Sequence, residues 1–160
     1  SRESHLETLR DMKANGQIRY IGVNTSHGRR HDEFEKVMKL DGIDFVQLTY
    51  NLTHRQVEER LLPLARERGI AVIANRPYSG GPLIKRLKNN NQPLPSWADE
   101  VGAKTWAEFL LKFIVSHPAI TCTIPATTRV EHMEENMRAG HGSLPDAKTR
   151  KRMIDYVQNL

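Results

Sequence analysis

Short apolar runs alternate with amphipathic segments along this chain. Four of the runs are rich in β-branched and aromatic residues, which is typical of strands. They lie at residues 18–23, 44–50, 70–74 and 120–124. Between them, apolar residues recur at helical spacing, and several of these segments end at a glycine. Strands that alternate with helices in this way predict a parallel sheet with right-handed crossovers.

The expected helices carry recognisable ends. Four of them open with a capping box, in which a short polar residue is followed three positions later by glutamate. The pairs are Ser4 and Glu7, Asp32 and Glu35, Thr105 and Glu108, and Thr128 and Glu131. We expect each capping side chain to accept a hydrogen bond from the first helical turn. A further helix is expected from about Arg55 to Gly69, and a last one over residues 147–159.

Two segments interrupt the alternation. Residues 89–104 form an insertion-like polar loop, which we expect Trp97 and Trp106 to anchor on the core. Residues 140–146 form a linker to the last helix. The helix that follows the insertion has an apolar stripe that we expect in the core, made of Phe109, Leu110, Phe113 and Ile114. Cys122, inside the last strand, is expected to be buried.

Polar side chains inside the expected strands, such as Arg19, Gln47 and Thr49, help to distinguish a doubly wound parallel sheet from a βα barrel. A doubly wound sheet favours continuous apolar strands, whereas a βα barrel lines its mouth with polar side chains. A closed barrel needs eight βα units and at least ~200 residues, but this chain offers four units in 160 residues. The sequence therefore predicts an α/β fold with a parallel sheet, half of a (β/α)8 TIM-type barrel, over residues 1–160.

Composition is that of an ordinary folded domain, with 38% hydrophobic and 27% charged residues. The net charge of +5 comes from scattered basic residues, so we expect no nucleic-acid partner. No apolar stretch reaches the ~20 residues of a membrane span, so we expect no membrane partner. The single cysteine excludes an intrachain disulfide. Because the chain begins at Ser1, almost inside a helix, we expect a piece of a longer protein, and localisation stays open.

The segment from residue 121 to 137 joins the last expected strand to a helix that begins near Thr128. Arg129 falls in the first turn of that helix, where a cation is unfavourable by ~0.3–1 kcal/mol because the helix dipole is positive there. An anion would offset that cost, so the pattern favours a phosphate site. His27 and His31 predict no metal site, because Gly28 interrupts a helix between them and no third ligand follows.

Three segments, at residues 18–24, 44–74 and 113–136, resemble in order and spacing the C-terminal half of the aldo-keto reductases. The resemblance implies an NADP(H)-binding (β/α)8 barrel that reduces small-molecule aldehydes or ketones by hydride transfer. In that family a tyrosine gives the proton and works with an aspartate, a lysine and a histidine on the first four strands. This sequence contains none of those strands. We therefore expect no catalytic residue in this chain, and we expect it to be the half of the barrel that holds the cofactor.

The resemblance also implies which residues contact the nicotinamide and the pyrophosphate. Those that match binders of the nicotinamide carboxamide are Asn24, Thr25 and Gln47. Asn75 stands where the family commonly stacks an aromatic ring, and Arg76, Pro77 and Tyr78 would wall the same site. Gly80 and Gly81 match a loop whose backbone approaches the pyrophosphate, which glycine permits because it tolerates positive φ.

The segment after the last strand matches the family's grip on the adenosine phosphate and the adenine. Its matching residues are Ile124, Pro125, Thr127, Thr128, Arg129, His132, Glu135 and Asn136. Ala126 stands where the family often has lysine or glycine, so one frequent phosphate ligand is absent. Arg129 and His132 remain as cations for a 2′-phosphate. The resemblance therefore favours NADP(H), with NAD(H) as the alternative.

Two functions remain open at this point. The first is an enzyme, in which the chain works only with an N-terminal half that carries the catalytic residues. The second is a standalone half-barrel that associates with itself as a homodimer and can bind a dinucleotide without turning it over. A lone parallel sheet leaves two edges unpaired, so either reading requires a partner for this chain.

Overall fold

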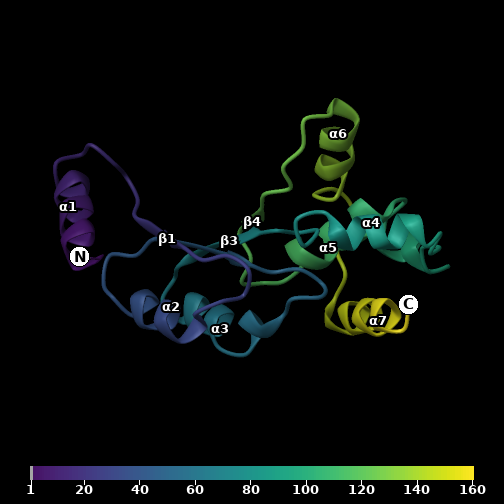
Figure 1. Ribbon diagram of the computed structural model, residues 1–160, viewed down its shortest axis with the longest axis horizontal. Coiled ribbons are helices and arrows are strands. Elements are labelled where there is room, and N and C mark those ends of the chain that lie inside the picture. Colours follow the sequence, from purple (N-terminus) through teal and green to yellow (C-terminus); the bar gives the residue numbers. More distant parts are fainter. Residues whose placement is uncertain (1) are drawn as a thin grey trace.

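Four parallel strands form the centre of the molecule (Figure 1). The structure, a computed structural model, describes residues 2–160. The strands lie side by side in chain order and are β1 (Gly22–Asn24), β2 (Phe45–Thr49), β3 (Ala71–Asn75) and β4 (Cys122–Thr123). Every neighbouring pair is parallel. The parallel α/β fold predicted from the alternation is therefore confirmed, although β1 and β4 are shorter than the apolar runs around them.

Helices connect and flank the strands. In the described part of the chain they are α1 (Arg2–Ala14), α2 (His31–Met38), η1 (Gln56–Glu58), α3 (Leu61–Glu67), α4 (Pro82–Asn89), η2 (Ala98–Val101), α5 (Trp106–Val115), α6 (Val130–Arg138) and α7 (Ala147–Gln158), where η denotes a 3-10 helix. Figure 1 shows α2 and α3 together on one side of the sheet, and α6 above α5 on the other side of the view. None of the described helices is long and apolar enough to cross a membrane.

The sheet has one buried face and one open face, because successive side chains of a strand point to opposite sides. The buried set on β2 and β3 is Val46, Leu48, Val72 and Ala74, each 0% exposed. These residues belong to the core that also contains the apolar residues of α3 and α5. The opposite set is only half-buried and comprises Phe45, Gln47, Ala71 and Ile73. The helices therefore cover one face of the sheet and leave the other accessible.

Helix α5 forms the centre of the core. As expected, its apolar stripe of Phe109, Leu110, Phe113 and Ile114 is fully buried. The loop before α5 is anchored by two tryptophans, as predicted. The rings of Trp97 and Trp106 lie 5.8 Å and 5.5 Å from the ring of Phe109, and Trp106 Nε1 donates to the carbonyl of Gln92 at 2.8 Å.

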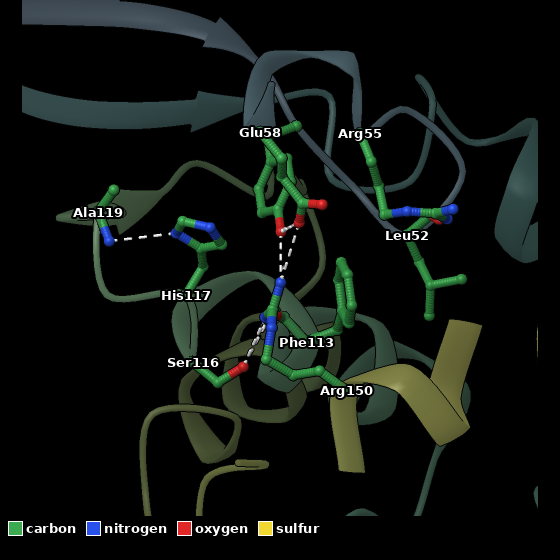
Figure 2. A network of polar contacts seen from close by, with 9 residues as sticks. Leu52, Arg55, Glu58, Phe113, Ser116, His117, Ala119 and Arg150 are labelled. Carbon is green, nitrogen blue, oxygen red and sulfur yellow. Dashed lines mark hydrogen bonds and ion pairs between the residues drawn. The ribbon is translucent and has the colours of Figure 1, made fainter. Parts of the chain in front are cut away.

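Arg150 on α7 ties the C-terminal helix to the sheet (Figure 2). Its guanidinium donates to Tyr50 Oη at 2.5 Å and to Glu58 at 3.2 Å. It also donates to Ser116 Oγ at 2.8 Å and lies 4.1 Å from the ring centre of Phe113. Burial raises the pKa of Tyr50, so its phenol keeps its proton and donates a hydrogen bond to Glu58. Because Tyr50 directly follows β2, this network fixes α7 at the carboxyl end of the sheet.

Only one of the four expected capping boxes forms. Thr105 caps α5 and accepts from the N–H of Glu108 at 3.2 Å. The predictions for Ser4 and Asp32 are wrong. Helix α1 begins at Arg2 and α2 at His31, so both residues lie inside the first turn and not at the capping position. Helix α3 likewise begins at Leu61, after the separate turn η1, and not near Arg55. The prediction for Thr128 is also wrong, because α6 begins after Arg129, which takes the capping position without a side-chain bond.

The prediction that Cys122 is buried is wrong as well. The in-register pairing aligns Asn24, Gln47, Ile73 and Cys122 in one row across the four strands. This row belongs to the open face, so Cys122 is exposed. A strand position predicts burial only when the corresponding face of the sheet is covered.

The two threonines allow a matched test of capping. We expect Thr105→Ala to lower the free energy of unfolding by about 1 kcal/mol, because α5 loses its side-chain cap. Thr128→Ala should change it by less than about 0.5 kcal/mol, since Thr128 is exposed and caps nothing. Urea unfolding followed by circular dichroism measures both. Equal losses in the two variants would contradict the assignment of the caps.

Candidate functional site

Polar side chains gather where the strands end. Parallel strands bring their carboxyl ends to one edge of a sheet, which is the usual place for ligands in such folds. Asn24 and Gln47 are register partners on β1 and β2. Asn24 is exposed and Gln47 is half-buried on the open face. Two of the residues expected at the nicotinamide are thus neighbours with accessible side chains.

Asn75 has a different environment from the one expected. Its side chain is only 6% exposed. Its Oδ1 accepts from Thr49 Oγ1 at 2.7 Å, and its Nδ2 donates to the carbonyl of Thr25 at 2.9 Å. Thr49 Oγ1 in turn accepts from the N–H of His27 at 3.0 Å. Asn75 therefore ties the ends of β1, β2 and β3 together, and its two polar atoms are already engaged.

The loop after β3 is tightly wound. Arg76 and Ser79 have positive φ values of 52° and 55°, and Gly80 and Gly81 follow with 76° and 106°. The guanidinium of Arg76 donates to the carbonyl of Ser79 at 3.2 Å. A Cβ at Gly80 would come within 2.8 Å of Arg76 Nη2. The backbone angle therefore favours glycine at position 80, and a larger residue would also displace the Arg76 guanidinium. Pro77, within this loop, is buried.

Asn51 supports this loop, and the sequence analysis missed it. Its side chain is 0% exposed. Its Nδ2 donates to the carbonyl of Arg76 at 2.8 Å, while its Oδ1 accepts from the N–H groups of Thr53 and His54, each at 3.0 Å. Asparagine followed two residues later by threonine, directly after a strand, is the pattern of an Asx turn. That pattern could have identified Asn51 as a structural residue.

Tyr78 joins the β3 loop to α6, far away in sequence. Its phenol donates to Asn136 Oδ1 at 2.7 Å. Burial, and then the charge of Glu135, raise the pKa of Tyr78, so the phenol keeps its proton. Two of the segments expected around a cofactor, residues 76–81 and 129–136, are therefore held against one another.

The joint before α6 is organised by Thr127. Its Oγ1 accepts from the N–H of Arg129 at 3.2 Å and lies 3.5 Å from His132 Nδ1. The side chain of Arg129 is 65% exposed, and its Nε lies 3.6 Å from a carboxylate oxygen of Glu131. Pro125 precedes this turn and is half-buried. The joint thus presents an accessible cation at the amino end of α6, partly neutralised by one exposed glutamate.

Metal chemistry finds no support in the described residues, where no group of three His, Cys, Asp or Glu side chains could hold an ion. His27 itself has a positive φ of 64°, so no helix runs through it to His31. What the site offers is a pair of amides on the open face, a tightly turned loop with two glycines and an exposed arginine. These groups suit a ligand with polar and anionic parts.

The fold and the site define an α/β protein with a parallel sheet and its polar residues at the carboxyl ends of the strands. The chain belongs to the Aldo/keto reductase family, whose sequence profile matches residues 2–152. Two curated relatives are uncharacterized oxidoreductases. YqkF of Bacillus subtilis is 24% identical, with 85% of this chain and 49% of the relative covered. C215.11c of Schizosaccharomyces pombe is 25% identical, with 86% and 42% covered.

Solved structures give the same fold. The holo form of aldo-keto reductase AKR11C1 from Bacillus halodurans superposes with a TM-score of 0.72 at 20% identity, with 94% of this chain and 54% of that chain covered. The thermostable aldo-keto reductase Tm1743 superposes with a TM-score of 0.66 at 25% identity, with 95% and 53% covered. The chain therefore spans about half the length of the relatives it matches.

The bond between Tyr78 and Asn136 makes a pH-dependent prediction. At neutral pH, Tyr78→Phe should lower the free energy of unfolding by about 0.5–1.5 kcal/mol, the net worth of a hydrogen bond. The folded-state pKa of Tyr78 lies above its unfolded value of about 10, so its stabilisation is full below that pH and declines above it.

The difference between the wild type and Tyr78→Phe should therefore shrink as the pH rises above about 10. Urea unfolding of both proteins across this range measures it. A difference that stays constant or grows with pH would contradict a neutral, buried phenol.

Proposed function

We propose that this chain is the NADP(H)-binding C-terminal half of an oxidoreductase of the aldo-keto reductase type. The proposal takes residues 1–160 as one half-barrel, with an inserted loop at residues 89–104 and a linker at 140–146. In the proposed enzyme the cofactor supplies the hydride that reduces an aldehyde or a ketone. The single observation that carries the proposal is the accessible sheet face, which bears Asn24 and Gln47. It fits with the length of the chain, which spans about half of the relatives it matches.

The half-barrel interpretation rests on the shape of the sheet. Both β1 and β4 are edge strands, since each is paired on one side within the described chain. A closed barrel has no edges, and eight strands are the number that side chains can fill. Four strands with one helix-covered face and one accessible face match half of that arrangement. A second half would pair with both edges and cover Phe45 and Ile73.

The described residues fit a dinucleotide in three places. Asn24 and Gln47 offer amide groups for the nicotinamide carboxamide, and Thr25 offers its hydroxyl oxygen as an acceptor, because that hydroxyl already donates to the carbonyl of Arg29 at 3.1 Å. The wound loop at residues 76–81 offers backbone N–H groups beside the amino end of α4, where an anion is favoured. The joint at residues 125–129 would hold the adenosine phosphate through Thr127 and Arg129.

The adenine end of the proposed site lies along α6. His132 is within hydrogen-bonding distance of Thr127, and Glu135 and Asn136 face Tyr78. Thr128 is exposed at the start of this segment and is free to contact a phosphate. Asn75 and Arg76 act indirectly in this proposal, because their polar atoms hold the strand ends and the loop.

The catalytic groups of the reaction are assigned to the other half. Tyr78 is a poor proton donor to a substrate, since its phenol is buried and already donates to Asn136. Tyr50 is likewise enclosed between Glu58 and Arg150. Neither phenol belongs to the open face. The chain by itself would therefore bind the cofactor without completing a reduction.

A second candidate function is a standalone half-barrel that pairs with a copy of itself. The two edge strands and the accessible face favour it, because a twofold axis along the barrel would bring β4 of one copy beside β1 of the other. Light scattering on the purified chain separates the two functions. The mass of two chains supports self-association, and a monomer at high concentration contradicts it.

Removal of Arg129 tests the cofactor proposal. We expect Arg129→Ala to weaken NADPH binding roughly tenfold or more, and NADH binding much less, because only NADPH carries the 2′-phosphate. Fluorescence titration measures both. Arg68→Ala is the matched control, since it removes an arginine that pairs with the fully exposed Asp41 away from the site. Equal losses for the two cofactors would contradict a 2′-phosphate contact.

A further inference from the structure

Helix α6 contacts α5, but its own side chains are not buried. None of its nine residues is buried, and Val130, Met133 and Met137 are exposed. Figure 1 shows α6 projecting above α5. An amphipathic helix is normally held by its buried apolar face. The buried apolar residue in this region is Ala139, 2% exposed directly after α6, so the position of the helix itself depends on other contacts as well.

Two charged residues of α5 provide the anchor. Glu108 is 2% exposed and Lys112 is 0% exposed, one helical turn apart on the same face of α5. Glu108 Oε1 accepts from Arg138 Nε at 2.6 Å, at the last residue of α6. Lys112 Nζ donates to the carbonyls of His141 and Ser143 at 2.6 Å and 2.9 Å. The pair thus binds the end of α6 and the linker that follows it.

These two charges lie in the most apolar helix of the molecule, so their burial has a cost. Burial raises the pKa of Glu108, but the bonds from Arg138 and from the N–H of Lys104 outweigh it and lower the pKa overall. Burial lowers the pKa of Lys112. Buried charges are tolerated only when they are fully paired, and apolar residues of similar size would often serve stability as well. Their placement is better explained by the position that they impose on α6.

The second anchor of α6 lies on its other side. Tyr78 donates to Asn136, only two residues before Arg138 and within the same helical turn. A shift of Arg138 would therefore displace Asn136 and Glu135 from Tyr78. Helix α6 is held between a carboxylate on α5 and a phenol on the β3 loop, with its amino end unanchored apart from the turn at Thr127.

We propose that Glu108 and Lys112 are positioning residues, which hold α6 through Arg138 and the linker so that its residues face the adenosine side of the cofactor site. This inference rests on the proposed function, because it assigns a role at the same site. Neither residue touches the cofactor in this account. They act by fixing the angle and the distance of α6 relative to the loop at residues 76–81.

Three variants and a control test the inference. Glu108→Gln keeps the shape of the side chain and removes the charge that attracts Arg138. Arg138→Gln removes the same ion pair from its half-exposed side, and Lys112→Met keeps the packing but removes both linker bonds. The control is Glu100→Gln, which breaks an exposed Glu–Arg pair of 2.7 Å between η2 and α7.

Hydrogen exchange is the first measurement, because it does not depend on a cofactor. We expect amide exchange of residues 130–138 to rise at least about tenfold in the three variants, since local opening of α6 becomes easier. Exchange of residues 109–114 in α5 should stay as in the wild type, and Glu100→Gln should leave α6 unchanged. An unchanged α6, or equal acceleration throughout the chain, overturns the inference.

Cofactor titration is the second measurement. The variants should bind NADPH roughly tenfold more weakly, while the affinity for reduced nicotinamide mononucleotide, which lacks the adenosine, stays the same. Faster exchange of α6 with unchanged NADPH affinity overturns the positioning role. If the wild-type chain binds no NADPH, the proposed function is wrong. The hydrogen-exchange data alone then decide whether Glu108 and Lys112 hold α6 in place.

Discussion

The in-register parallel pairing of β1 to β4 is the constraint on which the rest of this structure depends. Because the strands run the same way, their carboxyl ends meet at one edge and bring Asn24, Gln47 and the loop after β3 together. Because side chains alternate, the same register buries Val46 and Val72 against helices and leaves the opposite face accessible. The candidate site and the accessible face of the sheet thus follow from one arrangement.

The loops at the carboxyl edge are held by polar side chains that bond to one another and to the backbone. Asn75 and Asn51 are almost fully buried, and their amides connect strand ends and turns that the backbone alone would leave loose. Tyr78 extends this network to α6, and Glu108 and Lys112 hold the other side of that helix. Much of the polarity near the site is therefore internal support. Among the described residues, Asn24, Gln47, Thr128 and Arg129 have side chains that remain accessible for a ligand.

Local patterns in the sequence were enough to predict the alternation of strands and helices, the cap of α5 by Thr105 and the buried stripe of that helix. Three features depended on distant contacts and were missed or wrong. Thr128 has the right neighbours for a cap, but Thr127 takes the N–H of Arg129 and α6 begins later. Cys122 sits in an apolar run, yet its exposure depends on whether another layer covers that face. The double role of Asn75 depends on Thr25 and Thr49, which no local pattern connects to it.

The central claim is that this chain holds the cofactor and lacks the group that completes the reaction. The most direct test follows NADPH fluorescence and absorbance together while the purified 160-residue chain is mixed with NADPH and an aromatic aldehyde. The account predicts saturable binding of NADPH with no oxidation above the rate without protein. Oxidation of NADPH by the chain alone would contradict the division of roles between two halves, and the absence of saturable binding would contradict the cofactor site itself.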